Sequence, residues 1–482
     1  MNMKLHILII TCLVNVVFFG NTQTANEVVT KIITLPELES ASIGIYAIDV
    51  TSKKVVMEYN SNKLLTPAST TKLFSTALAL DVLGGDYRPQ TSIYYNGKIE
   101  NNKLEGDIWI IGGGDVSLGS KFFEKENKDA FLVNWLKIFQ ELGIQEINGG
   151  IYVDGSDFGY DGVPDDWLWG DIGNFYGTHF SGAMVYDNLL EYHFKTGAAG
   201  KKVELMYTIP ELDSFVFINN ILSSTKTGDN SYMFGAPYSN VREGRGTLSQ
   251  NNSDFMVKGS LPDPEYQLGK ALKQKLESVG VIVKGNVYST RVNQVPRPNQ
   301  TWTKVTDYKG KQLKEIVRAT NFESINVFAE GVMRLASFEK NKDGSHDRSS
   351  NYMLDFWKNK LGAKSLFIND GSGLSRTNAI SAKTMSDLLL YMNSSKASTD
   401  FYESLPIAGV SGTLKSVCKN QLGQGKVHAK SGTMRRTKSY AGYVEASSGK
   451  KIAFAFIFNQ YTVSNKEVVQ YMEQLMNALA KE

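Results

Sequence analysis

The chain has 482 residues, of which 42% are hydrophobic and 21% are charged, and its formal net charge at pH 7 is +3. The composition is that of a globular protein, and the length predicts about two to four domains. Because the net charge is small and no basic cluster occurs, the sequence argues against nucleic-acid binding.

The first 24 residues have the outline of a secretory signal peptide. Lys4 precedes a mainly apolar run over 5–19, and residues 20–25 are small or polar. We therefore expect a signal peptide over 1–24 and export to the periplasm or the cell-envelope exterior of a bacterium. A retained membrane anchor is the alternative, but a run of about 15 residues is short for a span. Cys12 would leave with the signal, so the single remaining Cys418 forms no internal disulfide.

The next segment contains the first candidate for catalysis. Two strands are predicted over 42–50 and 54–59, and an amphipathic helix follows Pro67 and ends near 84–85. Ser69 and Lys72 are three residues apart, so they lie one turn apart on the same helix face. A buried lysine can lose its proton near neutral pH and act as a base for serine. The pattern alone is weak, because five other Ser-x-x-Lys pairs occur: Ser223/Lys226, Ser337/Lys340, Ser416/Lys419, Ser447/Lys450 and Ser448/Lys451.

From residue 87 the chain changes to short strands and turns. Amphipathic helices over 135–143 and 271–280 are each followed by a glycine-led strand, which predicts one α/β domain. The stretch between these two units is rich in aromatic residues and predicts a nested smaller domain. The glycines at 112–114 lack the Lys-Ser/Thr of a phosphate-binding loop, so we interpret them as a tight turn at a strand end.

Strong periodicity returns after about residue 310. One helix is predicted over 322–336, a hairpin over 439–445 and 451–459, and a closing helix lined by apolar residues, namely Val468, Met472, Leu475 and Leu479. Strands at both ends of the chain predict one mixed sheet in which the two ends meet.

Two further motifs lie in this part of the chain. Ser324-Ile-Asn326 pairs a hydroxyl that can relay a proton with an amide that can hold a substrate, although helix capping also explains such residues. Lys430-Ser431-Gly432-Thr433 directly precedes the hairpin, where a strand edge with a lysine and hydroxyls suits recognition of a carboxylate. The rival triplets at 195–197 and 226–228 lie among turn residues, upstream of Ser324.

Ser-x-x-Lys, Ser-x-Asn and Lys-Ser/Thr-Gly in this order are the signature of penicillin-recognising serine enzymes. The chain resembles one family of them, the class C low-molecular-mass penicillin-binding proteins of the D-alanyl-D-alanine carboxypeptidase/endopeptidase type. Further blocks carry this resemblance from about residue 40 to the C-terminus, at 67–72, 113–115, 370–376, 405–409 and 441–443.

The resemblance implies an α/β (α+β) fold, a β-lactamase/transpeptidase-like domain with a mixed sheet flanked by helices and two nested insertions. The domain boundaries expected from it are a catalytic domain over 25–86 and 300–482, an inserted α/β domain over 87–184 and 256–299, and a nested domain over 185–255.

The resemblance also implies the role of each motif residue. Ser69 is the nucleophile and Lys72 its base, Ser324 and Lys430 relay the proton, and Asn326 holds the substrate amide. The substrate's terminal carboxylate is expected beside Ser431, Gly432 and Thr433, although the family usually has threonine at position 431. Asp154, Phe158, Arg376 and Arg435 are candidates for contact with the diamino acid of the stem peptide, and a structural role is the alternative for each.

The expected function is therefore a serine-type D-alanyl-D-alanine carboxypeptidase, with possible DD-endopeptidase activity, that binds peptidoglycan stem peptides and β-lactams. A β-lactamase or esterase on the same fold and a non-catalytic peptidoglycan-binding protein are the alternatives. No cofactor, metal or transmembrane segment after signal cleavage is expected, and no oligomeric state is predicted. The histidines show no ligand spacing; they are His6, His179, His193, His346 and His428.

Overall fold

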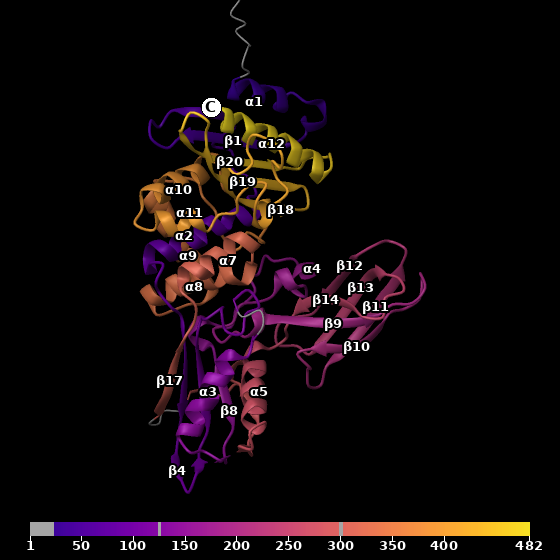
Figure 1. The fold of residues 1–482 in the computed structure, drawn as a ribbon, viewed down its shortest axis with the longest axis vertical. Helices are drawn as coiled ribbons and strands as arrows, with labels where there is room; N and C mark the ends of the chain where they lie inside the picture. The colour runs from indigo at the N-terminus through magenta and orange to yellow at the C-terminus, as the bar shows by residue number, and fades with distance from the viewer. Residues whose placement is uncertain (1–23, 124–126, 298–301) are drawn as a thin grey trace, which may run out of the picture.

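A computed structural model describes residues 24–123, 127–297 and 302–482 (Figure 1). The predicted signal peptide, apart from its last residue, lies outside the described residues. Within the described residues, no helix combines the length and the apolar character that crossing a membrane requires.

Strands from the two ends of the chain form a five-stranded sheet in the order β18-β19-β20-β1-β2. Its strands are β1 (Ser42–Asp49), β2 (Val55–Tyr59), β18 (Val427–Met434), β19 (Thr437–Glu445) and β20 (Lys451–Asn459). Strands β1 and β20 pair along their whole length, so the meeting of the chain ends is confirmed. The sheet is antiparallel throughout rather than mixed, because short turns join β1 to β2 and β18 through β20, and such turns connect antiparallel neighbours.

Helices cover both faces of this sheet (Figure 1). Successive residues of β1 point to opposite faces, so Ile45 belongs to one apolar core and Tyr46 to the other. The core with Ile45 is closed by α1 (Ala25–Ile33) and by α12 (Asn465–Lys481), which buries its predicted apolar stripe. The opposite core contains α2 (Lys72–Leu83), α7 (Leu313–Glu323), α8 (Asn326–Asn341), α9 (His346–Leu361), α10 (Ala382–Ser394) and α11 (Ser398–Glu403).

The helix predicted over 322–336 is wrong, because the chain breaks it. Ser324 adopts a left-handed conformation with φ of 60° and ends α7, while its N–H donates to the Thr320 carbonyl. Ile325 is extended, and α8 begins at Asn326. The apolar spacing continues across the break, which is why the sequence indicates a single helix. The break places the Ser-x-Asn motif at a helix junction.

The inserted domain contains a mixed five-stranded sheet in the order β16-β8-β6-β3-β17 and a small sheet in the order β15-β7-β5-β4. Helices α3 (Ala130–Glu141) and α5 (Pro264–Glu277) pack on these strands, which are β3 (Gln90–Tyr95), β4 (Lys98–Glu100), β5 (Lys103–Glu105), β6 (Ile108–Gly113), β7 (Glu146–Ile147), β8 (Ile151–Asp154), β15 (Ile282–Val283), β16 (Val287–Ser289) and β17 (Thr303–Lys309). Because β17 pairs with β3, residues 303–309 lie in this sheet and not in the catalytic domain, where the sequence places them.

The nested unit projects to the side of the molecule in Figure 1. It has two three-stranded sheets over a small apolar core. Its strands are β9 (Leu189–Lys195), β10 (Glu204–Ile209), β11 (Val216–Ser224), β12 (Asp229–Phe234), β13 (Val241–Ser249) and β14 (Phe255–Ser260). Since β14 pairs with β9, this unit extends to residue 260, beyond the expected boundary at 255. Two short helices, α4 (Trp169–Ile172) and α6 (Thr290–Asn293), complete the fold.

Candidate active site

Ser69 lies in a 3-10 turn, Ala68–Thr71, directly before α2. Thr70 Oγ1 donates to the Pro67 carbonyl over 2.7 Å, and Thr71 Oγ1 donates to the Ala68 carbonyl over 2.9 Å. These side-chain bonds hold the turn, in which Ser69 is half-buried. The sequence places Ser69 in the first helical turn, and the structure places it one turn earlier.

Lys72 begins α2 and is fully buried. Its Nζ lies 3.0 Å from Ser69 Oγ, 2.6 Å from Asn326 Oδ1 and 2.6 Å from the Ser372 carbonyl oxygen. These three partners are neutral. Burial lowers the pKa of Lys72 to about 7, against the opposing charges of Asp370 and Glu330. A large fraction of this amine is therefore neutral near pH 7 and able to take a proton from Ser69.

A second buried lysine, Lys430 on β18, completes the polar centre. Its Nζ lies 2.8 Å from Ser324 Oγ and 2.8 Å from the Ser431 carbonyl oxygen. Burial holds the pKa of Lys430 well below its usual value, and the charges of Lys72 and Lys438 act in the same direction. The structure thus brings together all five residues of the three motifs that the sequence proposes as catalytic.

The edge of β18 presents two hydroxyls next to this centre. Ser431 Oγ donates to Thr413 Oγ1 over 2.9 Å. Thr433 is exposed, and Lys438 Nζ donates to its Oγ1 over 2.8 Å. Burial lowers the pKa of Lys438 to about 8. Lys438 was not singled out from the sequence, because it lies outside the Lys-Ser-Gly motif and becomes its neighbour only through the β18–β19 hairpin.

Gly432 is required by a close approach within the protein. A Cβ at this position would lie 2.3 Å from Ser439 Oγ, 2.7 Å from the Pro67 carbonyl oxygen and 3.0 Å from the Ser69 nitrogen. Ser439 Oγ also donates to the Pro67 carbonyl over 2.5 Å. The sequence suggests that glycine allows close approach of a substrate, whereas the structure shows that it also lets β18 contact the turn of Ser69.

The loop that begins at Asp370 contacts Lys72 through the backbone carbonyl of Ser372. Asp370 Oδ1 accepts the Gly373 N–H over 2.8 Å, and the carbonyl of the same peptide unit, that of Ser372, accepts Lys72 Nζ. Glu330 Oε1 accepts the Ser372 N–H over 2.8 Å. Two buried carboxyl groups therefore act on the lysine through one loop. The sequence marks 370–376 as a family block but assigns no role to either residue.

The inserted domain forms one wall of the site. Trp167 Nε1 donates to Asp370 Oδ2 over 2.9 Å. The Tyr176 carbonyl accepts Asn326 Nδ2 over 2.6 Å, which orients the amide so that its oxygen faces Lys72. The active site is thus completed by a segment distant in sequence from all three motifs.

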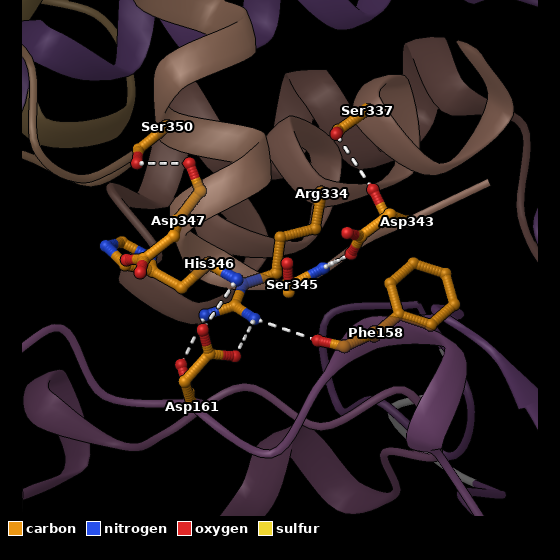
Figure 2. A network of polar contacts seen from close by, with 9 residues as sticks. All are labelled: Phe158, Asp161, Arg334, Ser337, Asp343, Ser345, His346, Asp347 and Ser350. Atoms are coloured by element: carbon orange, nitrogen blue, oxygen red, sulfur yellow. Dashed lines mark hydrogen bonds and ion pairs between the residues drawn. The ribbon is translucent and has the colours of Figure 1, made fainter. Parts of the chain in front are cut away.

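Two of the candidates for stem-peptide contact, Phe158 and Asp154, are buried within the inserted domain, which favours their structural role. Phe158 is fully buried against Phe180, and its carbonyl accepts Arg334 Nη1 over 3.1 Å (Figure 2). Asp154 is 1% exposed and forms an ion pair with Arg297. The sequence shows the residue types but not their depth, and both side chains are used within the inserted domain.

The two expected arginine contacts are exposed. Arg435 lies in the turn between β18 and β19, and Arg376 follows the Asp370 loop. Burial raises the pKa of Asp171, and the charge of Arg376 opposes this shift. Asp171 Oδ1 accepts the Tyr176 hydroxyl over 3.2 Å. Asp171 and Tyr176 therefore form an acidic and aromatic pair beside the site. The sequence predicts no role for either residue, because it shows only that the stretch around them is rich in aromatic residues.

The comparisons with known proteins agree with this geometry. A family model described as the D-Ala-D-Ala carboxypeptidase 3 (S13) family matches residues 25–482. The chain is 23% identical to the D-alanyl-D-alanine carboxypeptidase DacB of Haemophilus influenzae over 92% of each chain. It is 27% identical to a D-alanyl-D-alanine carboxypeptidase of an Actinomadura species, over 90% of this chain and 81% of that protein.

Solved structures share the fold. The crystal structure of penicillin binding protein 4 from Haemophilus influenzae has a TM-score of 0.79 and 23% identity, covering 94% of this chain and 99% of that one. A predatory peptidoglycan endopeptidase of Bdellovibrio bacteriovorus has a TM-score of 0.50 and 15% identity, covering 91% and 94%. The expected α/β architecture, a sheet flanked by helices with further domains, is confirmed.

Proposed function

This chain belongs to the D-Ala-D-Ala carboxypeptidase 3 (S13) family, and we propose that Ser69 is its nucleophile and Lys72 its general base. The chain is a serine peptidase, a hydrolase with D-alanyl-D-alanine carboxypeptidase activity. The observation that carries the assignment of residues is the 3.0 Å contact between Ser69 Oγ and a buried amine whose pKa is lowered to about 7.

In the first step, Ser69 Oγ attacks the carbonyl carbon of the penultimate D-alanine while Lys72 takes the hydroxyl proton. The backbone N–H groups of Ser69 and Thr433 are the donors to the oxyanion. The closeness of Gly432 to the Ser69 nitrogen supports this pairing, since it brings β18 against the nucleophile's turn.

In the second step, the C–N bond breaks, and Ser324 and Lys430 relay the proton that Lys72 took from Ser69 to the leaving amine. The 2.8 Å contact between Lys430 Nζ and Ser324 Oγ supports this relay. Water then cleaves the ester of Ser69, which returns the free hydroxyl and releases the shortened peptide.

The substrate contacts follow from the groups that surround this centre. Asn326 holds the substrate amide, and Ser431 with Thr433 binds the terminal carboxylate, with Lys438 adding positive charge beside Thr433. Asp171 and Arg376 replace Asp154 and Phe158 as candidates for contact with the diamino acid of the stem peptide. Peptidoglycan stem peptides are the proposed substrates, β-lactams the proposed covalent inhibitors, and the bacterial cell envelope the proposed location.

Covalent labelling by a fluorescent penicillin tests this function. We expect labelling of the wild-type chain, none of Ser69→Ala, and release of D-alanine from a pentapeptide ending in D-Ala-D-Ala. Ser416→Ala is the matched control, because Ser416 and Lys419 repeat the Ser-x-x-Lys spacing but are exposed. Labelling that persists in Ser69→Ala would overturn the assignment, and rapid release of the penicillin acyl group would indicate a β-lactamase.

A further inference from the structure

Asp166 connects the inserted domain to the loop that carries Arg376. Its Oδ2 accepts the hydroxyl groups of Ser375 and Thr377, the two neighbours of Arg376 in the chain. Ser375 is fully buried, and a hydroxyl that donates to a carboxylate forms a stronger bond than one that donates to a neutral oxygen. No step of the mechanism above uses Asp166.

This carboxylate holds the chain on both sides of Arg376. Ser375 Oγ and Thr377 Oγ1 lie 2.8 Å apart, and the Thr377 N–H donates to Ser375 Oγ over 3.2 Å. The other oxygen of Asp166, Oδ1, is buried and accepts no hydrogen bond from any residue in 24–123, 127–297 or 302–482. Within these ranges the two hydroxyls are therefore the only donors to Asp166, so a change on either side removes the contact.

Trp167, the next residue, contacts the opposite end of the same loop. Its Nε1 donates to Asp370 Oδ2 over 2.9 Å, and Asp370 belongs to the end of the loop that contacts the general base. Asp166 contacts the end that carries Arg376. Two adjacent residues of the inserted domain thus hold two different parts of the site.

Arg376 is exposed, and it forms no hydrogen bond or ion pair with any residue that the structure describes. Its charge acts on Asp171, where it opposes the rise in pKa that burial causes. A free arginine side chain has many rotamers, so the volume that its guanidinium samples depends on where its backbone is held. A guanidinium held beside the active site suits a carboxylate, with which it forms paired bonds.

We propose that Asp166 is a positioning residue for Arg376, which it holds toward the diamino acid of the stem peptide. The inference rests on the proposed function, in which Arg376 is a candidate for this contact, and deepens it by naming the residue that holds Arg376 in place. Side chains that bind a ligand must stay within about 0.5 Å of the productive geometry, which needs a supporting contact of this kind. Because Asp166 forms no hydrogen bond with a motif residue, its loss affects recognition of the peptide and not acylation itself.

The test compares two pentapeptides on the full chain, both ending in D-Ala-D-Ala, with meso-diaminopimelate or L-lysine at the third position. The two differ by one side-chain carboxylate. In Asp166→Ala we expect the ratio of kcat/KM for the first peptide to kcat/KM for the second to fall by about tenfold, mainly through KM, because a binding contact is lost. Acylation by penicillin, which lacks this side chain, should change by less than about twofold.

Asp165→Ala is the matched control, because it removes the same charge at the neighbouring position, where the side chain is exposed and forms no bond to a described residue. Ser375→Ala/Thr377→Val keeps the carboxylate of Asp166 and removes its two donors, so this variant should lower the ratio as Asp166→Ala does. Arg376→Gln should lower the ratio too, and adding Asp166→Ala to it should lower the ratio no further, since both changes act through one contact.

Equal losses on both peptides and on penicillin would overturn the inference, because Asp166 would then have a merely structural role. Additive effects of Asp166→Ala and Arg376→Gln would overturn it as well, since the two residues would act separately. An unchanged ratio in either single variant would show that Asp166 does not position Arg376 for this contact. Labelling of Ser69 by penicillin does not depend on the peptide side chain, so it tests the proposed function separately.

Discussion

Two buried polar clusters lie along α8, and they differ in the groups that contact their positively charged side chains. The cluster at the start of the helix contains Asn326 and the two lysines, which donate to neutral oxygens. The second, two turns further along, surrounds Arg334 (Figure 2). Arg334 is fully buried and donates to the Phe158 and Asp161 carbonyls over 3.1 Å and 2.7 Å, and it faces the Asp161 carboxylate at 3.4 Å.

This difference indicates that the first cluster has a catalytic role and the second a structural one. A lysine without a close carboxylate loses its proton readily when buried, whereas an arginine stays charged and needs several acceptors. The Arg334 cluster joins α8 to the loop at 157–161, and Asp161 Oδ2 also accepts the His346 N–H over 3.0 Å. We infer that the first cluster supplies a base and that the second positions the inserted domain, whose Trp167 and Tyr176 reach the site.

The largest effect is expected from Lys72→Met, which removes the base but keeps an apolar side chain of similar length. Acylation by penicillin should slow by about 10²–10⁴-fold, the usual contribution of general acid–base catalysis. Thermal stability should change little, because the gain from removing a buried amine is offset by the loss of its bonds to Asn326 Oδ1 and the Ser372 carbonyl. Acylation at the wild-type rate, measured by stopped-flow labelling, would contradict the role of Lys72.

Arg334→Met should give the opposite pattern. Removing the guanidinium leaves Asp161 Oδ1 and the carbonyls of Phe158 and Asp161 without this donor, which should lower the free energy of unfolding by about 1–3 kcal/mol. Urea denaturation measures this loss, and labelling of the folded fraction should remain near the wild-type rate. Unchanged stability together with lost acylation would show that Arg334 acts in catalysis, and it would contradict the structural role assigned to its cluster.

Gly432→Ala tests the packing of β18 on the nucleophile's turn. The added Cβ must displace Ser439 Oγ or the Pro67–Ser69 backbone, and a shift of this kind should reduce the acylation rate by about 10²-fold. Gly197→Ala is the control from the rival Lys-Thr-Gly triplet, because its nearest neighbour, Lys201 Cβ, is 4.0 Å away. Equal rates in the two variants would show that the close approach has no catalytic consequence.

The smallest effect, expected from Glu330→Gln, is a shift in pH dependence. Acylation should rise with pH through an apparent pKa of about 7 as Lys72 loses its proton. The charge of Glu330 raises the pKa of Lys72, so its removal should move this limb to lower pH and make acylation faster than in the wild type near pH 7, where part of the wild-type Glu330 is ionised. Burial raises the pKa of Glu330 itself to about 7, so the glutamine resembles its neutral form. An unmoved limb would show that Glu330 is not coupled to Lys72.

Features that depend on local spacing were predictable from the sequence. The hairpin of β19 and β20, the apolar stripe of α12 and the Ser69–Lys72 spacing all arise from residues close together in the chain. The order of the three motifs indicated the family, because each motif keeps its own chemistry and its place along the chain.

Tertiary structure alone decided how deep residues lie and which distant segments meet. The sequence could not show that Ser324 ends one helix before Asn326 begins the next, because the apolar period runs through the break. It offered Phe158 as a candidate substrate contact although the side chain is buried in the core, and it gave no role to Asp370, which reaches Lys72 through a peptide unit. Burial and long-range contacts depend on how elements pack against one another, and spacing along the chain does not record that packing.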